Sequence, residues 1–254
     1  MKVLVCIKRV PAVAGRISLT DDSRAIDSKY LGFAIGPHEE CAVEEAVRIV
    51  EAQGGESVVL TLGPTESIEQ LRDAMAIGMS RAIHLVTNGE EWDPESTAAA
   101  IVEAARADEA ESGPFDLVLF GNESGDTGGY QVAARVGRAL GMPVLTGLKG
   151  LSVADGVLHG EQVVPGGRDI YEVALPAVAS VLEGLNLPRY PSVPGRIRAK
   201  SKPVAASNPT RPDQRLEMLR LVVPEGAAKQ VEILGSGAGA AAATVDLFDR
   251  IGIL

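Results

Sequence analysis

Aromatic residues are scarce in this chain of 254 residues, which has one Trp, four Tyr and four Phe. Proteins that bind single-stranded nucleic acids stack bases on aromatic side chains, so the scarcity argues against that class of ligand. Basic residues are also outnumbered, because 24 Lys and Arg face 34 Asp and Glu, and a formal net charge of −10 argues against a general binder of phosphate backbones. We therefore expect no nucleic-acid partner. The 28 Gly and the many Ala and Val residues instead favour helices packed closely on a sheet.

Long apolar runs are missing too. No stretch approaches the ~20 residues that a membrane-spanning helix needs, and the apolar part of the first ten residues is too short for a signal peptide. We expect no insertion into a membrane. At roughly 150 residues per domain, the length allows one large domain with an appendage or two small ones.

Residues that commonly perform catalysis or bind metals are few, with two Cys and three His. Cys6 and Cys41 lie in apolar surroundings without a further Cys or His at metal-ligand spacing, which disfavours a zinc site and favours a reduced, cytoplasmic chain. Ser124 lacks the G-x-S-x-G context of a nucleophile elbow. Paired acids such as Glu44 and Glu45 are expected to be solvated. The sequence therefore predicts no catalytic residue.

Short apolar runs alternate with amphipathic segments over the first half of the chain, which predicts an α/β fold with a parallel sheet and helices on both faces. Such sheets bind ligands at the carboxyl ends of the strands, near the point where strand order reverses. We expect the loops at 8–13, 36–38, 62–64 and 121–132 to converge there. Strands are predicted at 3–7, 57–62, 82–86 and 115–120, and helices at 38–53, after an N-cap at Thr65, at 94–106 and at 130–140.

The second half follows a different pattern. Short stretches at 144–146, 158–164, 170–175 and 177–182, broken by Gly and Pro, predict antiparallel strands added to one sheet edge. Regular structure is expected to thin out over 188–212, before a strand at 219–223 and a flexible Gly-rich linker at 235–239. Val245, Phe248 and Ile251 then lie on one side of a short terminal helix. Such an arm is typical of a segment that packs on a partner subunit or a neighbouring domain.

The loop 121–129 has the sequence Gly-Asn-Glu-Ser-Gly-Asp-Thr-Gly-Gly and leads into a predicted helix. Small residues let backbone N–H groups approach a phosphate, and the N-terminus of the following helix favours the same anion. The loop matches neither the Walker A pattern nor G-x-G-x-x-G. A phosphate cradle and an ordinary turn explain it equally well.

The segment 185–202 is basic although the chain is acidic, and no acid occurs between Gly184 and Asp213. A solvated linker is the usual explanation for such a charge run. However, a free linker would not carry apolar residues such as Tyr190 and Val193 among rigidifying prolines. We therefore interpret the segment as a docking surface for a partner. Its basic residues are Arg189, Arg196, Arg198, Lys200 and Lys202, and its other apolar residues include Leu187 and Ile197.

Several segments, taken in order, resemble the β subunit of electron transfer flavoproteins. The resemblance covers roughly residues 1–203, whereas the C-terminal arm matches in character only. It implies a three-layer Rossmann-like fold, similar to that of the adenine nucleotide α-hydrolases. The matching segments are Lys2–Pro11, Ala42–Arg48, Leu62–Pro64, Leu71-Arg72 with Ala74–Gly78, Asp116–Gly121, Asp126 with Gln131-Val132, and above all Leu187–Pro194 with Ala199–Lys202.

The resemblance implies an electron-transfer protein rather than a stand-alone enzyme. In that family an α subunit holds most of the FAD, and the β subunit holds a second nucleotide, usually AMP. The heterodimer takes electrons from acyl-CoA dehydrogenases or related flavoenzymes and passes them to a quinone oxidoreductase or another acceptor. For this chain the family organisation implies a nucleotide-binding domain at 1–185, a partner-recognition loop at 186–203, and an arm at 204–254 that packs on the α subunit.

The family's binding residues can be transferred to matching positions. Gln131 and the backbone at the start of the following helix would meet the AMP phosphate. Val193 would be the apolar anchor that enters a dehydrogenase pocket, where family members often have Leu. The cofactor-binding residues would be Cys6, Gly36, Pro37, His38, Glu39, Leu62, Gly121, Asn122, Glu123, Ser124, Asp126, Thr127, Gly128, Gly129, Tyr130, Gln131 and Val132. The partner-binding residues would be Pro188, Arg189, Tyr190, Val193, Pro194, Ile197 and Ala199.

Some positions depart from the family. Gly36 replaces the Asn of an Asn-Pro pair, and Val13 and His38 stand where AMP-type members tend to have aromatic residues near the flavin. Electron-bifurcating relatives hold a second FAD in β and oxidise NADH; we expect AMP ahead of FAD here. An ATP-hydrolysing or adenylylating enzyme of similar fold would need a Ser-Gly-Gly loop where 8–11 reads Lys-Arg-Val-Pro. A nucleotide-sensing module would leave the segment 188–202 unexplained.

Overall fold

The structure is a computed structural model that describes residues 1–12, 17–223 and 232–253. Val13, for which the family resemblance implies a place near a flavin, lies outside the described residues. The chain divides into two compact units, Met1–Arg220 and Leu221–Leu254, and each is described by itself.

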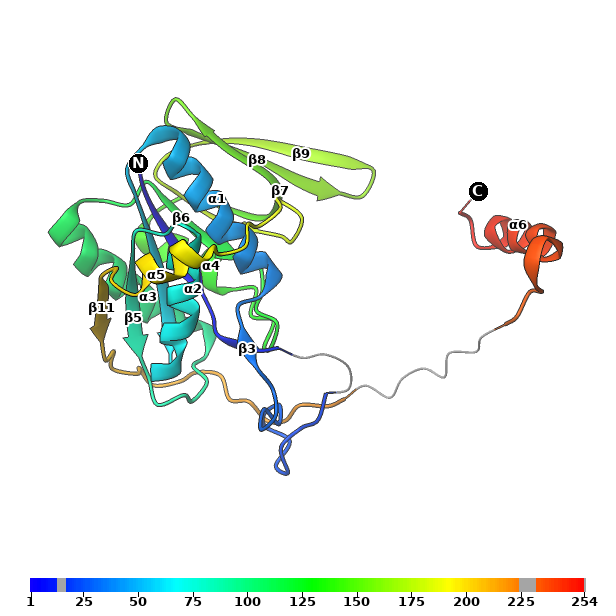
Figure 1. The fold of residues 1–254 in the computed structure, drawn as a ribbon, viewed down its shortest axis with the longest axis horizontal. Coiled ribbons are helices and arrows are strands. Elements are labelled where there is room, and N and C mark those ends of the chain that lie inside the picture. Colours follow the sequence, from blue (N-terminus) through cyan, green and yellow to red (C-terminus); the bar gives the residue numbers. More distant parts are fainter. Residues whose placement is uncertain (13–16, 224–231, 254) are drawn as a thin grey trace. The chain divides into compact units, whose positions relative to one another are not determined.

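The first unit contains a nine-stranded sheet, with the order β11-β5-β4-β1-β6-β10-β7-β8-β9. Neighbouring strands are parallel from β11 to β7, whereas β8 and β9 are antiparallel and extend the sheet as a hairpin (Figure 1). A separate antiparallel pair is formed by β2 (Val10–Pro11) and β3 (Phe33–Ala34). The sheet strands are β1 (Lys2–Ile7), β4 (Glu56–Gly63), β5 (Arg81–Val86), β6 (Leu117–Gly121), β7 (Val144–Ala154), β8 (Val157–Val164), β9 (Gly167–Ala174), β10 (Ala177–Val181) and β11 (Val204–Ser207).

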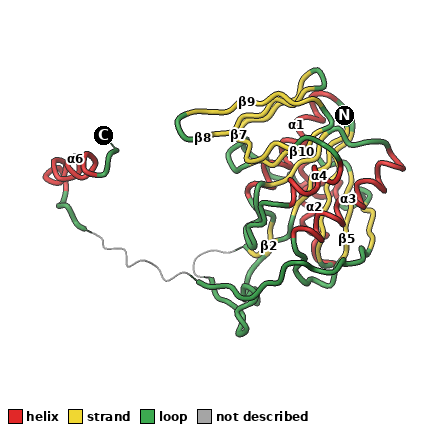
Figure 2. The backbone as a smooth tube through the Cα atoms, turned by 180° about the vertical axis from the view of Figure 1, so that it is seen from behind, coloured by secondary structure: helices red, strands yellow, loops and turns green. Residues whose placement is uncertain are grey.

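Helices cover both faces of the parallel part of the sheet. Side chains alternate along a strand, so Val3 and Val5 of β1 join one hydrophobic cluster while Leu4 and Cys6 join the other. The first cluster packs against α1 (Pro37–Gln53) and α2 (Ile68–Ile77), with α5 (Val193–Ala199) beside α2; the second packs against α3 (Pro94–Ser112) and α4 (Val132–Leu140). Figure 2 shows the same unit from behind. The predicted α/β fold with three layers is confirmed.

The predicted position of one strand was wrong. The stretch 177–182 was expected among antiparallel edge strands, but β10 lies between β6 and β7 and is parallel to both. All five of its residues are buried, as is typical of a central strand covered on both faces. The Pro and Gly residues around it resemble hairpin punctuation, which explains the error.

Some element boundaries also differ. Thr65 does not cap α2, because it lies inside a short 3-10 turn, Thr65–Ser67, that precedes the helix. Helix α3 runs six residues beyond Arg106 as a largely exposed end without apolar periodicity, and Gly113 terminates it. The segment 188–212 is more regular than expected, since it contains α5 and β11. By contrast, residues 219–223 form no strand, and Leu219 is 74% exposed.

The second unit contains a 3-10 turn, Gly237–Ala240, which overlaps the predicted Gly-rich linker at 235–239 and is followed by α6 (Ala241–Arg250). Val245, Phe248 and Ile251 are all partly or well exposed in this unit. The predicted amphipathic end therefore forms a helix whose apolar side chains have little cover. No helix among the described residues is long and apolar enough to cross a membrane.

Candidate functional site

The strand order reverses beside β1. The chain passes from β1 to β4 and β5 on one side, and then returns to β6 on the other side. The carboxyl ends of β1, β4 and β6 are Ile7, Gly63 and Gly121, and a ligand site is expected where such strands end. The loops that follow β1 and β6, together with the start of α1, form the candidate site described next.

Glu39 connects the start of α1 to the loop after β1. Its side chain lies in the first helical turn, and the residue is only 4% exposed. Its Oε2 accepts the Gly36 N–H at 2.6 Å and its Oε1 accepts the Lys8 N–H at 3.1 Å. Burial raises the pKa of Glu39 to about 7 in spite of these two hydrogen bonds. One carboxyl group thus holds two backbone segments together.

Gly121 brings the loop after β6 against the same helical turn. A Cβ at this position would lie 2.8 Å from Cγ of Glu39 and 3.1 Å from Cβ of His38, so only glycine fits without a shift. The buried Nδ1 of His38 has no hydrogen-bond partner among the described residues. Oγ of Ser67, next to Gly63 at the end of β4, is also buried and unpartnered within the described ranges. The strand ends therefore hold polar atoms whose hydrogen-bonding capacity is unused.

Lys8 links three loops at this edge. Its Nζ lies 2.8 Å from Oδ2 of Asp126 and 2.7 Å from Oε1 of Glu91, and it donates to Oγ1 of Thr127 at 3.2 Å. Burial alone would lower the pKa of Lys8, but the carboxylates of Glu91 and Asp126 raise it above its usual value. Burial alone would raise the pKa of Asp126, but Lys8 lowers it below its usual value. Both groups are thus held charged. Neither Lys8 nor Glu91 was identified as a site residue from sequence, although Lys8 directly follows a buried strand.

The remaining residues of the loop 121–132 have different environments. Asn122 is fixed on the sheet side, because its N–H donates to Val181 O at 2.9 Å and its Oδ1 accepts the Ser180 hydroxyl at 3.0 Å. Gln131 is exposed, and its Oε1 accepts hydrogen bonds from Arg135, one turn into α4. Tyr130 is 61% exposed. The loop is therefore anchored at its start and open at its end, where α4 begins.

Two other predicted cofactor residues lie on the strands themselves. Cys6 belongs to the second hydrophobic cluster, and burial raises the pKa of its thiol. Leu62 lies near the end of β4 and packs against the same cluster. These two residues pack in or against the hydrophobic core beneath the strand ends, while 36–39 and 121–127 lie at the edge. Among the described residues, no group of three or more His, Cys, Asp or Glu side chains is placed to hold a metal ion.

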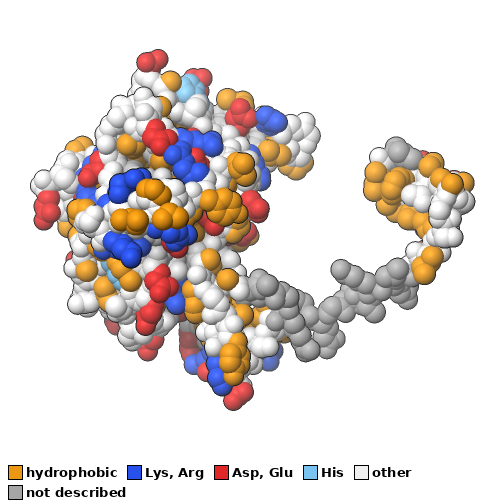
Figure 3. Space-filling model, in the orientation of Figure 1, with side chains coloured by type: hydrophobic (Ala, Val, Ile, Leu, Met, Phe, Trp, Pro, Cys, Tyr) orange, Lys and Arg blue, Asp and Glu red, His pale blue; other side chains and the backbone are white. Residues whose placement is uncertain are grey.

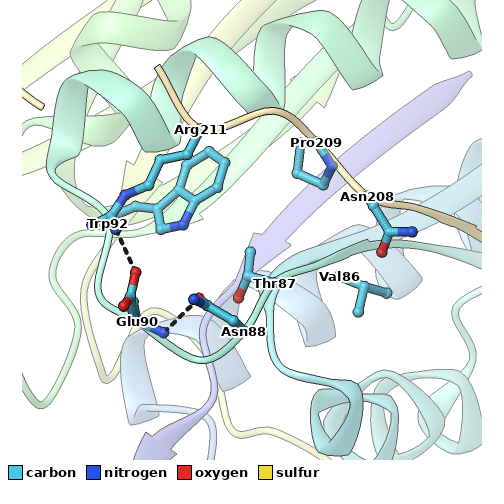
Figure 4. Close-up of a pocket in the computed structure, with 8 residues that line it drawn as sticks. All are labelled: Val86, Thr87, Asn88, Glu90, Trp92, Asn208, Pro209 and Arg211. Carbon is cyan, nitrogen blue, oxygen red and sulfur yellow. Dashed lines mark hydrogen bonds and ion pairs between the residues drawn. The ribbon is translucent and has the colours of Figure 1, made fainter. Parts of the chain in front are cut away.

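A separate pocket lies at the carboxyl ends of β5 and β11 (Figure 4). The Arg211 guanidinium lies 5.8 Å from the centroid of the Trp92 ring and 2.8 Å from a carboxylate oxygen of Glu90. The segment after β11 thus packs across the loop after β5. None of the pocket residues was predicted as a site residue. They are Val86, Thr87, Asn88, Glu90, Trp92, Asn208, Pro209 and Arg211.

The predicted partner-recognition segment has exposed apolar side chains. We call the set Leu187, Tyr190, Val193 and Ile197 the apolar patch; these residues are 85%, 96%, 73% and 65% exposed. Figure 3 shows hydrophobic and basic side chains gathered over the position of α5. Ala199 differs from its predicted partner-binding neighbours, because it is 1% exposed and packs in the first hydrophobic cluster.

Comparisons with known proteins agree with this description. A family model described as "Electron transfer flavoprotein domain" matches residues 25–212. The chain is 32% identical over 234 residues to the electron transfer flavoprotein subunit beta of Syntrophomonas wolfei, which covers 92% of this chain and 90% of that relative. It is 36% identical over 208 residues to the subunit beta of Mycobacterium leprae (80% and 77% covered) and 33% identical over 207 residues to the mitochondrial subunit beta of Arabidopsis thaliana (80% of each). These matches confirm the resemblance found in the sequence: the chain belongs to the electron transfer flavoprotein β subunit family.

Proposed function

We propose that this chain is the β subunit of a heterodimeric electron transfer flavoprotein, with an α subunit that holds most of the FAD. The FAD supplies the electron-carrying chemistry when it is bound, and this chain recognises the proteins that exchange electrons with it. The donors are acyl-CoA dehydrogenases or related flavoenzymes, and the acceptor is a quinone oxidoreductase or a similar protein. The observation that carries this proposal is the apolar patch, four exposed apolar side chains on one basic segment.

The chemistry of the apolar patch defines the partner surface that would fit it. Exposed apolar side chains in a soluble protein are typical of interaction sites. Here Arg198 and Lys200 are exposed beside the patch, and Arg196 pairs with Asp73 at 2.7 Å. A matching partner therefore offers an apolar pocket for Val193, edged by carboxylates that attract the basic rim.

The candidate site at the strand ends is proposed to hold AMP. Two features of the structure support an adenine nucleotide: the backbone of Gly121 packs directly against Glu39 and His38, so that the two loops meet at the strand ends, and the buried Nδ1 of His38 has no hydrogen-bond partner among the described residues. Residues 36–39 would hold the nucleoside, and the open end of the loop 121–132 would hold the phosphate at the start of α4. Lys8 would keep Asp126 in place below it.

The ligand content of the purified heterodimer tests both parts of this proposal. The chain is co-expressed with an α subunit of the family, the complex is purified, and the nucleotides are released and quantified by chromatography. One FAD and one AMP per complex is the expected result. Two FAD and no AMP per complex would mean that this chain binds a second flavin, and would indicate the electron-bifurcating type that oxidises NADH. A chain that never forms a yellow complex with an α subunit would refute the proposed function itself.

The second unit is proposed to bind the α subunit. The side chains of Val245, Phe248 and Ile251 in and after α6 are 53%, 38% and 54% exposed, so they are available to another protein. The predicted arm begins at 204, but its first residues form β11, which belongs to the sheet. Only the residues after β11 are therefore available to bind a partner. Removal of residues 233–254 should abolish co-purification with the α subunit while the remaining chain stays folded by circular dichroism. Unchanged co-purification would refute this role.

The compartment in which the complex works is proposed to be reducing, as in the cytoplasm. Cys6 and Cys41 are both free and buried, which supports that assignment. Thiol titration of the purified, denatured chain should find two reactive thiols.

A further inference from the structure

Arg189 points toward its own subunit rather than outward. Its Nε lies 2.9 Å from Oε2 of Glu44, and its backbone N–H donates to the same oxygen at 3.1 Å. Its Nη1 and Nη2 reach the two oxygens of Glu51 at 2.7 and 2.9 Å. One guanidinium thus bridges two carboxylates that lie two turns apart on α1. The sequence predicts direct partner contact for Arg189, and in this structure its guanidinium is bound within its own subunit while its side chain stays 38% exposed.

Glu44 is unusual for an acid in a helix, because its side chain is only 2% exposed. Arg48, one turn along α1, donates to Oε1 of Glu44 at 2.7 Å. Burial alone would raise the pKa of Glu44, but Arg189 and Arg48 lower it below its usual value, so the carboxylate stays charged. A partner protein cannot touch this side chain while the segment covers it.

A second contact fixes the residues just before the apolar patch. The amide Nδ2 of Asn186 donates to Cys41 O at 3.0 Å and to Oε2 of Glu45 at 2.9 Å. Arg48 Nη2 also reaches Leu187 O at 3.4 Å. The amino-terminal end of the segment is therefore bonded to α1 over two successive turns.

The carboxyl-terminal end is bonded to α2. Nη1 of Arg72 donates to Ala199 O at 2.5 Å and to Lys202 O at 2.8 Å. In return, Nζ of Lys202 donates to Met75 O and Met79 O at the end of α2. At Gly195 a Cβ would lie 2.4 Å from Ala76 O, so α5 packs closely on α2. Between the two bonded ends, the side chains of the apolar patch stay exposed.

We propose that Arg189 and Glu44 are positioning residues that hold the apolar patch in its docking conformation before the partner arrives. This inference rests on the proposed function. A segment that is ordered in advance loses less conformational freedom on binding, so the same apolar contacts give a higher affinity. The bidentate fork of Arg suits this task, since it fixes direction as well as distance. Affinity for the dehydrogenase thus depends on a buried carboxylate that the dehydrogenase never contacts.

The test uses the FAD-loaded heterodimer with the variants Arg189→Gln, Glu44→Gln and the double variant. Four quantities are measured for each: FAD content, KM and kcat for a flavin dehydrogenase as electron donor, and hydrogen exchange of residues 187–199. Glu161→Gln is the matched control, because it removes an ion pair with Arg168 on the β8–β9 hairpin. Glu51→Gln removes only the exposed half of the bridge and remains usable if Glu44→Gln fails to fold.

We expect each single variant to raise KM about tenfold, with kcat and FAD content unchanged and with faster exchange at 187–199. The double variant should give the same KM as the single variants, because each single variant already removes the interaction between Arg189 and Glu44. Glu51→Gln should give a smaller rise in KM in the same direction. An increase in KM for Arg189→Gln but not for Glu44→Gln, with unchanged exchange, would instead establish direct contact and overturn the inference. If Val193→Asp leaves KM unchanged, the patch does not dock at all, and the proposed function fails separately.

Discussion

Replacement of Val193 by Asp should remove most of the affinity for the electron donor. Full burial of a Val side chain contributes about 1.5–3 kcal/mol, and Val193 is 73% exposed before docking, so roughly 1–2 kcal/mol of that gain is available. An unpaired carboxylate in an apolar pocket adds a desolvation penalty of at least similar size. The combined loss of at least ~3 kcal/mol corresponds to a decrease in kcat/KM of at least ~100-fold.

The substitution should leave the fold intact. Val193 is the first residue of α5, and Ser192 caps this helix by accepting the Gly195 N–H at 3.1 Å. An acid is favourable in the first turn of a helix because it opposes the positive end of the dipole. FAD content and thermal stability of the heterodimer should therefore match the wild type.

The assay follows reduction of the bound flavin by a dehydrogenase at varied heterodimer concentration. Val163→Asp is the matched control, because Val163 is 59% exposed on β8, outside the apolar patch. Val193→Leu should act in the opposite direction, since one added methylene contributes about 0.8 kcal/mol and raises kcat/KM roughly fourfold. Equal kcat/KM for the two Asp variants would refute the role of Val193 as an anchor.

Three further predictions concern the strand ends and the core. Gly121→Ala should push against Glu39, lower the free energy of unfolding by roughly 1–3 kcal/mol and reduce the amount of bound nucleotide. Gly125→Ala should change neither quantity, because the nearest neighbour of its added Cβ lies at 3.8 Å. Thermal denaturation and nucleotide content check both variants. The pKa of Glu39 is about 7 in the folded state, against 4.5 for an unperturbed Glu, so its contribution to stability is full below pH 4.5 and decreases by roughly 3 kcal/mol as pH rises to 7. Glu39→Gln should abolish this dependence of the free energy of unfolding on pH, measured by urea denaturation. An unchanged pH dependence would contradict the assignment. Burial alone would raise the pKa of Asp108, but Arg81 and Lys2 at 2.5 and 2.6 Å hold it at about 2, so its contribution is present above pH 3.8 and is lost as pH falls through 2. Asp108→Asn should therefore destabilise the chain by roughly 2 kcal/mol at pH 7 and by much less at pH 2, which the same denaturation experiments measure.

The core was predictable because its physical cause is local. Residues 3–7 form a continuous apolar run, and β1 is buried on both faces as such a run predicts. The position of β10 was not predictable in the same way, because sequence order does not say which strands pair after a Pro-punctuated turn. The end of α3 was missed for a different reason, since exposed helical turns lack apolar periodicity and only Gly113 marks where the helix stops.

The candidate site was partly predictable for a topological reason. Parallel strands end at one edge, so the segments 36–39 and 121–132 could be expected to meet, and contacts between Gly121 and Glu39 bring them together. The link from Lys8 to Glu91 depends on the side-chain geometry of two loops and left no pattern in the sequence. Glu44 was expected to be solvated, like most paired acids, but Arg189 covers it from a segment 145 residues away.

The two outer strands of the sheet affect how the chain behaves at high concentration. An unpaired strand edge offers free N–H and C=O groups to any other extended chain, which promotes aggregation. β9 forms one edge and carries Arg168, Asp169 and Glu172, and charges on an edge oppose the addition of a further strand. β11 forms the other edge and has only four residues, too few to template a long ladder. Both edges of this large sheet thus carry features that oppose the addition of a further strand.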